Sequence, residues 1–507
     1  MKHFSTLLEM VALQDSAAVA MSAPMGVPLH YGELQALIRR SIARLNGWGI
    51  GRGDRVAIVL PNCPEMACAF VAVASACSAA PLNLAYREDE FAFYLNDLQA
   101  RAVLLLAGSD TPARAVAQRL GILQIDLQPL PDQGAGNFEL CLIAEEAAAP
   151  QRGGPALADE VGLILHTSGT TSRPKIVPLT QRNLCASARN IATTLQLTPA
   201  DRELHVMPLF HIHGLIAGVL APLAAGSQIY CTPGFNALKF FGWMRECRPT
   251  WYTAVPTMHQ TILARAAGNM DVIRANPLRF LRSSSSSMPP QVIAELERVF
   301  EAPLIESYGM TEAAHQMASN PLPPARRIPG SVGVAAGPEI AIMDAQGQLL
   351  APDEIGEVVI RGENVTSAYE NNDRANVEAF VHGWFRTGDQ GRLDADGYLT
   401  LTGRLKEIIN RGGEKISPRE VDEVLMDHPA VAQVVTFAVA HEKLGEDVAA
   451  AVVLHEGRQL SERELRDFCA KRLADYKVPR RIVFLAEIPK GATGKLQRIG
   501  LAAQLGL

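Results

Sequence analysis

The sequence predicts an α/β protein built on doubly wound parallel sheets, and two observations support this. Over residues 31–106, short apolar runs that suit buried strands alternate with segments of helical periodicity. Strand, helix and strand in repeated succession produce a parallel sheet with helices on both faces. In addition, a length of 507 residues allows two or more domains with large cores.

The first elements follow in order from these patterns. Residues 34–45 carry apolar side chains at helical spacing, and Asn46-Gly47 can end that helix. Pro64 suits the first turn of an alanine-rich helix that runs to about Ser78. The other elements expected here are strands at 55–60, 80–83 and 102–106 and a helix at 88–98. Residues 107–160 carry little signal, and we expect a variable surface region there.

Composition excludes several classes of protein. Apolar residues make up 48% and charged residues 20%, and the net charge of −6 offers no field for nucleic acid or an anionic membrane. Eight cysteines without a C-x-x-C pair suit reduced thiols in a cytoplasm. Polar residues such as Glu9 and Gln14 interrupt the first segment, so we expect neither a signal peptide nor a membrane span.

A hydroxyl-rich loop lies between two short apolar runs at 161–165 and 175–178, which suit strands. Backbone N–H groups, hydroxyls and a cation can converge in such a loop, and a polyphosphate would suit them. The spacing is not that of the P-loop, and from the loop alone a polar surface hairpin stays an alternative. The candidate phosphate-binding residues are Thr167, Ser168, Gly169, Thr170, Thr171 and Lys175.

Two stretches between residues 205 and 290 allow more than one interpretation. His211 and His213 would share a face in an extended segment, but no third ligand stands near enough in the sequence to favour a metal. Five serines at 283–287 could form a low-complexity loop. Because they follow a strand-like run and precede Pro289-Pro290 and a helix, a single strand-to-helix turn is favoured.

Four later motifs decide how the hydroxyl-rich loop is interpreted. They are Tyr308-Gly-Met-Thr-Glu312, Trp384-Phe-Arg-Thr-Gly-Asp389, Gly403-Arg404-Leu-Lys406 and Pro489-Lys-Gly-Ala-Thr-Gly-Lys495-Leu-Gln-Arg498. Read bare, each has an ordinary structural explanation, such as a turn cap for Asp389 or a solvated lysine for Lys495. Together with the loop, and in this order, they resemble the adenylate-forming superfamily over nearly the whole chain. That superfamily includes acyl-CoA synthetases, firefly luciferase and the adenylation domains of peptide synthetases.

The resemblance implies a role for each matching residue. Tyr308 and Gly309 would face adenine, Thr311 the phosphate, and Asp389 and Arg404 the ribose side of the nucleotide. Glu312 would hold Mg²⁺, which takes few protein ligands and keeps its waters. The remaining residues with an implied role are Lys495 in adenylation, Lys406 as the hinge, and Gly412, Gly413 and Lys415 on the CoA side.

The resemblance also divides the chain in two. Residues 1–403 would form an AMP-binding domain with the acyl pocket and a β-rich subdomain, and residues 404–507 a small mobile α+β lid. The implied reaction has two steps, from carboxylate and ATP to acyl-AMP and pyrophosphate, and then with CoA to acyl-CoA and AMP. Whether two copies form a homodimer is left open.

The acyl pocket suggests the acid. The resemblance places the segment with His211 and His213 there, together with the turn that carries Ser285 and Ser287, where relatives carry Gly-Ala-Ala. His315 is not part of the family's common motif, and we add it to the pocket as a further candidate donor. The motifs are most similar to those of oxalate–CoA ligases, and a second carboxylate would need such donors. We expect His315 to supply positive charge near neutral pH.

Three alternatives stay open. A fatty or aryl acid–CoA ligase would differ only in the pocket. A carrier-protein-loading adenylation domain would pass its acyl group to a protein, and a non-catalytic nucleotide-binding module would be expected to lack Glu312 or Lys495.

Overall fold

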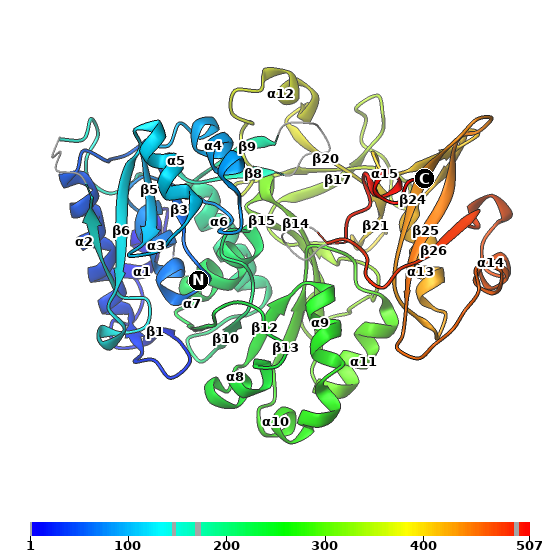
Figure 1. Cartoon of the computed structure of the whole chain (residues 1–507), viewed down its shortest axis with the longest axis horizontal. Coiled ribbons are helices and arrows are strands. Elements are labelled where there is room, and N and C mark those ends of the chain that lie inside the picture. Colours follow the sequence, from blue (N-terminus) through cyan, green and yellow to red (C-terminus); the bar gives the residue numbers. More distant parts are fainter. Residues whose placement is uncertain (1–2, 144–148, 168–173, 491–495) are drawn as a thin grey trace.

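The computed structural model describes residues 3–143, 149–167, 174–490 and 496–507. Figure 1 shows the first third of the chain beside a second sheet region, with a β-rich part above and the C-terminal part at the far side. The predicted α/β class is confirmed, because both large sheets consist mainly of parallel neighbours.

The first large sheet has the strand order β7-β6-β5-β3-β4-β8-β9 in the described residues. Strands β3, β4, β5, β6 and β8 run parallel, whereas β7 and β9 pair antiparallel at the two edges. Its strands are Arg55–Val59 (β3), Ser78–Pro81 (β4), Ala102–Leu106 (β5), Leu123–Pro129 (β6), Phe138–Leu142 (β7), Val161–Thr167 (β8) and Lys175–Thr180 (β9).

The second large sheet has the order β16-β15-β14-β13-β12-β10-β11-β1-β2. Parallel pairing runs from β1 to β14, and β15 and β16 add antiparallel neighbours at the edge beside the candidate site. The strands are Val19–Ser22 (β1), Leu29–His30 (β2), Arg202–His205 (β10), Gln228–Cys231 (β11), Trp251–Ala254 (β12), Phe280–Ser283 (β13), Leu304–Met310 (β14), His315–Ser319 (β15) and Val334–Ala335 (β16).

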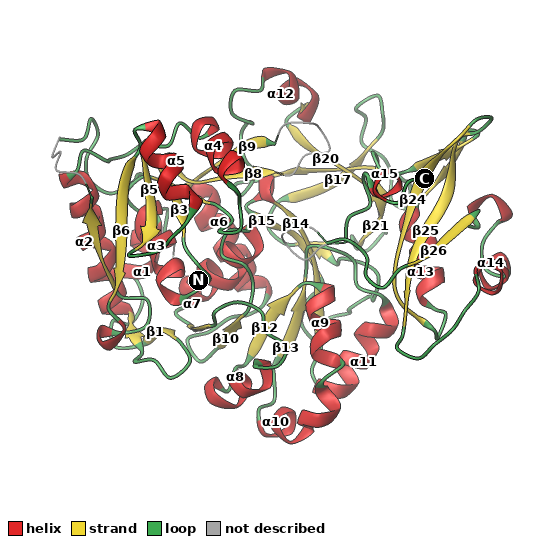
Figure 2. Cartoon of the chain, viewed as in Figure 1, coloured by secondary structure: helices red, strands yellow, loops and turns green. Residues whose placement is uncertain are grey.

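Helices fill the space between these sheets and cover their other faces (Figure 2). The helices of this part are Leu7–Ala12 (α1), Tyr31–Gly47 (α2), Pro64–Ala74 (α3), Glu88–Asp97 (α4), Pro112–Leu120 (α5), Gln181–Thr194 (α6), His213–Leu220 (η2), Ala221–Ala225 (α7), Phe240–Cys247 (α8), Pro256–Leu263 (α9), Met270–Ala275 (α10) and Pro290–Phe300 (α11). Short 3₁₀ turns are Pro131–Gln133 (η1), Ala266–Asn269 (η3) and Thr311–Ala313 (η4). Thr180 caps α6, since its hydroxyl accepts a bond from Asn183 N at 3.1 Å.

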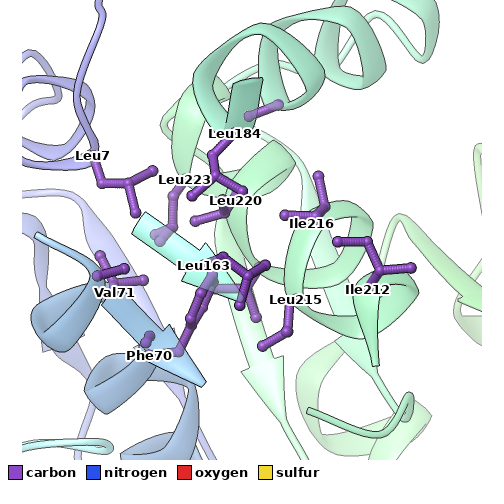
Figure 3. Close-up of a cluster of buried hydrophobic side chains, with 14 of the residues drawn as sticks. Leu7, Phe70, Val71, Leu163, Leu184, Ile212, Leu215, Ile216, Leu220 and Leu223 are labelled. Carbon is purple, nitrogen blue, oxygen red and sulfur yellow. The ribbon is translucent and has the colours of Figure 1, made fainter. Parts of the chain in front are cut away.

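The largest core lies where α1, α3, α6 and η2 meet β8. Figure 3 shows Leu163 of β8 surrounded by apolar side chains from these elements, including Phe70, Leu184 and Ile216. Helix α6 contacts β8 and β9 of the first sheet and β15 of the second. The core therefore fixes both sheets relative to each other, and with them the two walls of the candidate site.

A smaller antiparallel sheet and the C-terminal part complete the molecule. The smaller sheet contains Glu339–Met343 (β17), Gly356–Arg361 (β18), Phe380–Val381 (β19), Trp384–Leu393 (β20) and Leu399–Arg404 (β21), with helix Asp373–Ala379 (α12). The C-terminal part contains Ile409–Arg411 (β22), Glu414–Ile416 (β23), Pro418–Met426 (α13), Val431–His441 (β24), Gly445–Leu454 (β25), Glu462–Ala470 (α14), Asp475–Lys477 (η5), Arg481–Phe484 (β26) and Leu501–Gln504 (α15). Its buried residues form hydrophobic clusters of their own, all after residue 408.

Two local expectations were wrong. The region 107–160 is not a plain surface segment, because α5, β6 and β7 lie in it and extend the first sheet. His213 is not in an extended segment but begins η2, a π-helix, so it does not share a strand face with His211. π-Helical turns are rare and often lie at functional sites.

Two further features bear on later arguments. No helix in the described part of the chain is both long and apolar enough to cross a membrane. All eight cysteines are free; Cys141 on β7 is exposed, Cys63 is half-buried, and the other six are buried.

Candidate functional site

One half of the site lies where the ends of β14 and β21 meet the middle of β20. The Tyr308 hydroxyl donates to Asp389 Oδ2, and Arg404 Nε lies 3.1 Å from Asp389 Oδ1. Asp389 and Arg404 are direct partners in the β20–β21 register. The Asp389 carboxylate raises the pKa of Arg404, and burial raises that of Tyr308. A carboxylate held from two sides in this way is well placed to accept ribose hydroxyls.

The other half centres on Glu312, one turn beyond Tyr308 in η4. Tyr369 donates to Glu312 Oε1 at 2.8 Å, and Lys175 Nζ lies 4.3 Å from the centre of the Tyr369 ring. Burial raises the pKa of Glu312, while the bond from Tyr369 and the nearby Lys175 oppose that shift. Burial lowers the pKa of Lys175; Glu312 opposes this shift and Lys406 adds to it. Lys175 and Arg404 are therefore the two cations that favour the ionised form of this carboxylate.

The ends of the hydroxyl-rich loop reach this carboxylate. Thr167 ends β8 and pairs with Lys175 at the start of β9, and β9 contacts η4. Ser168, Gly169, Thr170 and Thr171, like Lys495, lie outside the described residues. Thr311 is half-buried in η4.

Gly309 is required by close approach. A Cβ at this position would lie 1.8 Å from the carbonyl oxygen of His315, on the antiparallel neighbour β15. The absence of a side chain lets β15 pack directly against the strand that carries Tyr308. This contact places His315 beside the nucleotide half of the site.

Several of the expected acyl-pocket residues meet in one buried polar cluster. His213 Nδ1 lies 3.1 Å from Ser285 Oγ, and His213 Nε2 lies 2.7 Å from Thr253 Oγ1. The rings of His213 and His315 stack with centroids 4.8 Å apart. Three elements far apart in sequence, η2, the turn after β13 and β15, thus converge at one point.

Arg282 lies at the centre of this cluster, and sequence reasoning missed it. Its guanidinium contacts Nε2 of His213 at 3.3 Å and Nε2 of His315 at 3.2 Å. The side chain is fully buried, and burial lowers its pKa to about 9. A positive charge therefore lies beside His315, on Arg282, whereas the expected charge on His315 itself stays a prediction.

Other expected residues are placed differently. Ser287 is exposed and does not join the cluster, because the turn after β13 points it outward, toward solvent. His211 is half-buried before η2, where its Nδ1 accepts from the backbone N of His213 at 3.3 Å. Within the described residues, no group of three His, Cys, Asp or Glu side chains could hold a metal ion, so the His211–His213 metal pair gains no third ligand there.

The residues expected on the CoA side lie in and beside a hairpin turn of the C-terminal part. Gly412 and Gly413 join β22 to β23 with φ of 60° and 102°, a left-handed conformation that favours glycine. Nothing lies within 4 Å of a Cβ added at Gly413. Lys415 and Lys406 are exposed.

Comparison with known proteins bears on the whole chain. Residues 8–370 match the family model described as AMP-binding enzyme, and residues 420–495 match the AMP-binding enzyme C-terminal domain. Oxalate–CoA ligase of Arabidopsis thaliana is 45% identical over 97% of both chains. Oxalate–CoA ligase of Saccharomyces cerevisiae is 40% identical over 92% of this chain and 89% of its own length.

Solved structures are similar to this chain over nearly its whole length. ATP-bound MatB from Rhodopseudomonas palustris superposes with a TM-score of 0.87 at 27% identity, covering 98% of this chain and 97% of that one. The o-succinylbenzoate CoA synthetase of Bacillus subtilis, solved with its acyl-adenylate intermediate, gives 0.83 at 29% identity, covering 100% of this chain and 98% of that one. With two family models across the chain and close relatives over its length, this protein belongs to the AMP-binding, adenylate-forming enzyme family.

Proposed function

We propose that the protein is an ATP-dependent acid–CoA ligase whose preferred acid is oxalate. The observation that carries the proposal is the convergence of two half-sites at the end of β14. Asp389, held by Tyr308 and Arg404, suits a ribose, and Glu312 lies one turn away beside Lys175. A nucleoside triphosphate would suit both halves, with its ribose at Asp389 and its phosphates beside Glu312 and Lys175.

In the first step, an oxygen of the acid attacks the α-phosphorus of ATP. The new O–P bond forms as the bond to pyrophosphate breaks, so two anions must approach each other. Lys175 and Lys495 would offset this charge, as preorganised cations do in phosphoryl transfer. In the second step, the thiol of CoA attacks the acyl carbon and loses its proton, and AMP leaves with the bonding electron pair.

The residues fit Mg²⁺ as a cofactor. Glu312 offers a single buried carboxylate, and Mg²⁺ in nucleotide sites commonly takes one or two protein oxygens together with phosphate oxygens and waters. When bound, the ion would neutralise phosphate charge. Glu312 would hold it, and Tyr369 would orient that carboxylate.

Oxalate is favoured because the pocket cluster is polar and buried. His213, Ser285 and His315 meet there, and a second carboxylate can accept hydrogen bonds from such groups, whereas an alkyl chain cannot. The oxalate–CoA ligases among the relatives support the same acid.

A medium-chain acid is the second candidate, because one observation favours it. An apolar cavity of about 280 Å³ opens beside Phe210, between Leu60 and Phe235. An alkyl chain directed there would avoid the polar cluster.

A substrate panel tests the proposal. ATP–pyrophosphate exchange and CoA thioester formation should be measured with oxalate, malonate, acetate, octanoate and cinnamate. We expect oxalate to give the highest kcat/KM. A preference of about tenfold or more for octanoate or cinnamate would overturn oxalate and keep the ligase chemistry. No exchange with any acid would overturn both.

We also infer a reducing, cytoplasmic setting. Eight free cysteines, most of them buried in the core, support it.

A further inference from the structure

Arg282 is a fully buried cation whose partners are neutral. It projects from β13 between three other elements, and its two terminal nitrogens contact four groups. These are His213 Nε2 at 3.3 Å, Thr253 Oγ1 at 3.2 Å, His315 Nε2 at 3.2 Å and Gln316 Oε1 at 3.2 Å. Its Nε has no partner among the described residues. An interior guanidinium normally requires an anion, since removing it from water is costly.

The guanidinium dictates where the imidazole protons lie. Arginine only donates hydrogen bonds, so Nε2 of both His213 and His315 must accept. Each ring is then neutral, with its proton on Nδ1. His213 fits this assignment at both nitrogens, because Thr253 can also donate to Nε2 and Nδ1 can donate to Ser285 Oγ at 3.1 Å.

The Nδ1 side of His315 lies against the strand that carries Tyr308. A Cβ at Gly309 would lie 3.3 Å from His315 Nδ1, and Gly309 directly follows Tyr308. The two rings stack 18° from parallel, so they present their edges together. Two stacked imidazolium rings would repel each other. A single buried guanidinium behind two neutral rings supplies charge without that repulsion.

We propose that Arg282 is a specificity-determining positioning residue: it holds His213 and His315 as Nδ1–H donors and provides the buried positive charge that matches the second carboxylate of a short dicarboxylic acid. This inference rests on the proposed function and adds the residue that selects the substrate. A monocarboxylate such as acetate has no second charge and gains nothing from Arg282.

The charge state of Arg282 gives a signature in pH. With its pKa lowered by burial to about 9, the group is charged at pH 7 and loses its proton as the pH rises through that value. The titratable groups that face it are His213 on η2 and His315 on β15. His259 on α9 contacts its backbone carbonyl at 3.1 Å, and burial lowers the pKa of His259 to about 4, so it is already neutral. The kcat/KM for oxalate should therefore fall above about pH 9, whereas that for acetate should not.

The experiment compares Arg282→Met and Arg282→Lys with wild type, with Arg279→Met as the control. Arg279 directly precedes β13, is exposed and pairs with the buried Asp201 at 2.5 Å, outside the cluster. ATP–pyrophosphate exchange is measured with oxalate and with acetate from pH 6 to 10, without CoA, so that the thiol does not titrate in the assay.

We expect Arg282→Met to lower kcat/KM for oxalate by about one to two decades, mainly through KM, and to leave acetate nearly unchanged. Arg282→Lys should restore part of the loss, and Arg279→Met should not change the oxalate-to-acetate ratio. The alkaline limb with oxalate should be absent in Arg282→Met.

Equal losses for oxalate and acetate in a folded Arg282→Met protein would overturn the inference and reduce Arg282 to a structural role. If neither variant folds, the wild-type profiles decide, and parallel oxalate and acetate profiles above pH 9 would overturn it. A wild-type preference for octanoate refutes the proposed substrate itself. A wild-type preference for oxalate that Arg282→Met retains refutes only the role of Arg282.

Discussion

At the scale of single residues, the chemistry depends on how Glu312 is kept ionised. Its carboxylate is buried, and burial raises its pKa, which works against metal binding. Tyr369 counters this by donating to Oε1 at 2.8 Å, and Lys175 lies against the same ring. Tyr369 thus contacts both Lys175 and Glu312 and connects the two charged groups.

Tyr369→Phe isolates the hydroxyl, because the ring under Lys175 remains. Without the donor the protonated form of Glu312 is favoured, so its pKa rises further. A hydrogen bond to a charged group contributes about 1.5–3 kcal/mol, or about one to two pH units. The acid limb of kcat/KM for ATP should move upward by that amount, with the largest loss near pH 6.

The control is Tyr398→Phe, whose hydroxyl donates to the carbonyl of Arg326 at an exposed position. Tyr398→Phe should not shift the acid limb of the kcat/KM profile for ATP. An unchanged acid limb in Tyr369→Phe would mean that Glu312 does not set it.

A site residue can be predicted from the sequence when it belongs to a recognisable motif. Tyr308, Glu312, Asp389 and Arg404 belong to compact motifs whose order carries information. Tyr369 meets Glu312 from 57 positions away, and Arg282 meets His213 from 69 positions away. Tyr369 belongs to none of the motifs, and Arg282 stands beside the serine run without any pattern that marks it, so only the fold brings each to its partner.

At the scale of elements, buried central strands and capped helices were the predictable part. Strand β5 has its expected bounds, and α14 opens with a capping box between Ser461 and Glu464, a pairing that is readable in the sequence. In contrast, β7 is an edge strand whose side chains alternate between buried and exposed, and α5 is rich in alanine and arginine. The π-helix η2 is apolar apart from His213 at its start, so it has no period to detect.

The β22–β23 hairpin carries the prediction at this scale. Gly413→Leu should leave pyrophosphate exchange intact and lower CoA thioester formation, because the side chain would project into open space on the proposed CoA side. We expect a loss of about tenfold or more in the second step, measured with supplied acyl-AMP.

Strain at positive φ is a separate effect, and Gly457 controls for it. Gly457 also has a positive φ, of 74°, and open space around it, in a turn of the same C-terminal part. Gly457→Leu should keep thioester formation. Equal losses in both variants would assign the effect to strain and remove Gly413 from the CoA path.

At the scale of the whole molecule, two independently packed parts meet at a narrow connection. Arg419 on α13 donates to the carbonyls of Leu401 at 2.8 Å and Gly330 at 3.3 Å in the N-terminal part. The predicted boundary at residue 404 coincides with the end of β21, and it stays a prediction.

Arg498 stabilises the C-terminal part. It binds Asp422 at 2.8 Å, Glu407 at 3.1 Å and the carbonyl of Thr436, and burial raises the pKa of Asp422 despite this arginine. Arg498→Met would leave Asp422 largely buried without its cation, at a cost of about 1–3 kcal/mol.

We expect calorimetry of Arg498→Met to show an earlier C-terminal transition and an unchanged N-terminal one. Arg463→Met is the control, because its ion pair with Asp467 on α14 is exposed. A uniform shift of a single transition would show that the two parts unfold together.

The free cysteines lie at different depths and in different cores, so their reactivity can report local unfolding of each part. A thiol reagent meets Cys141 on the edge strand at once, since that side chain is already at the surface. Cys469 lies in the C-terminal core, whereas Cys68 and Cys185 lie in the large N-terminal core. Each buried thiol becomes reactive only when its own core opens. The order in which the cysteines are modified therefore shows which core opens first, and no added probe is needed.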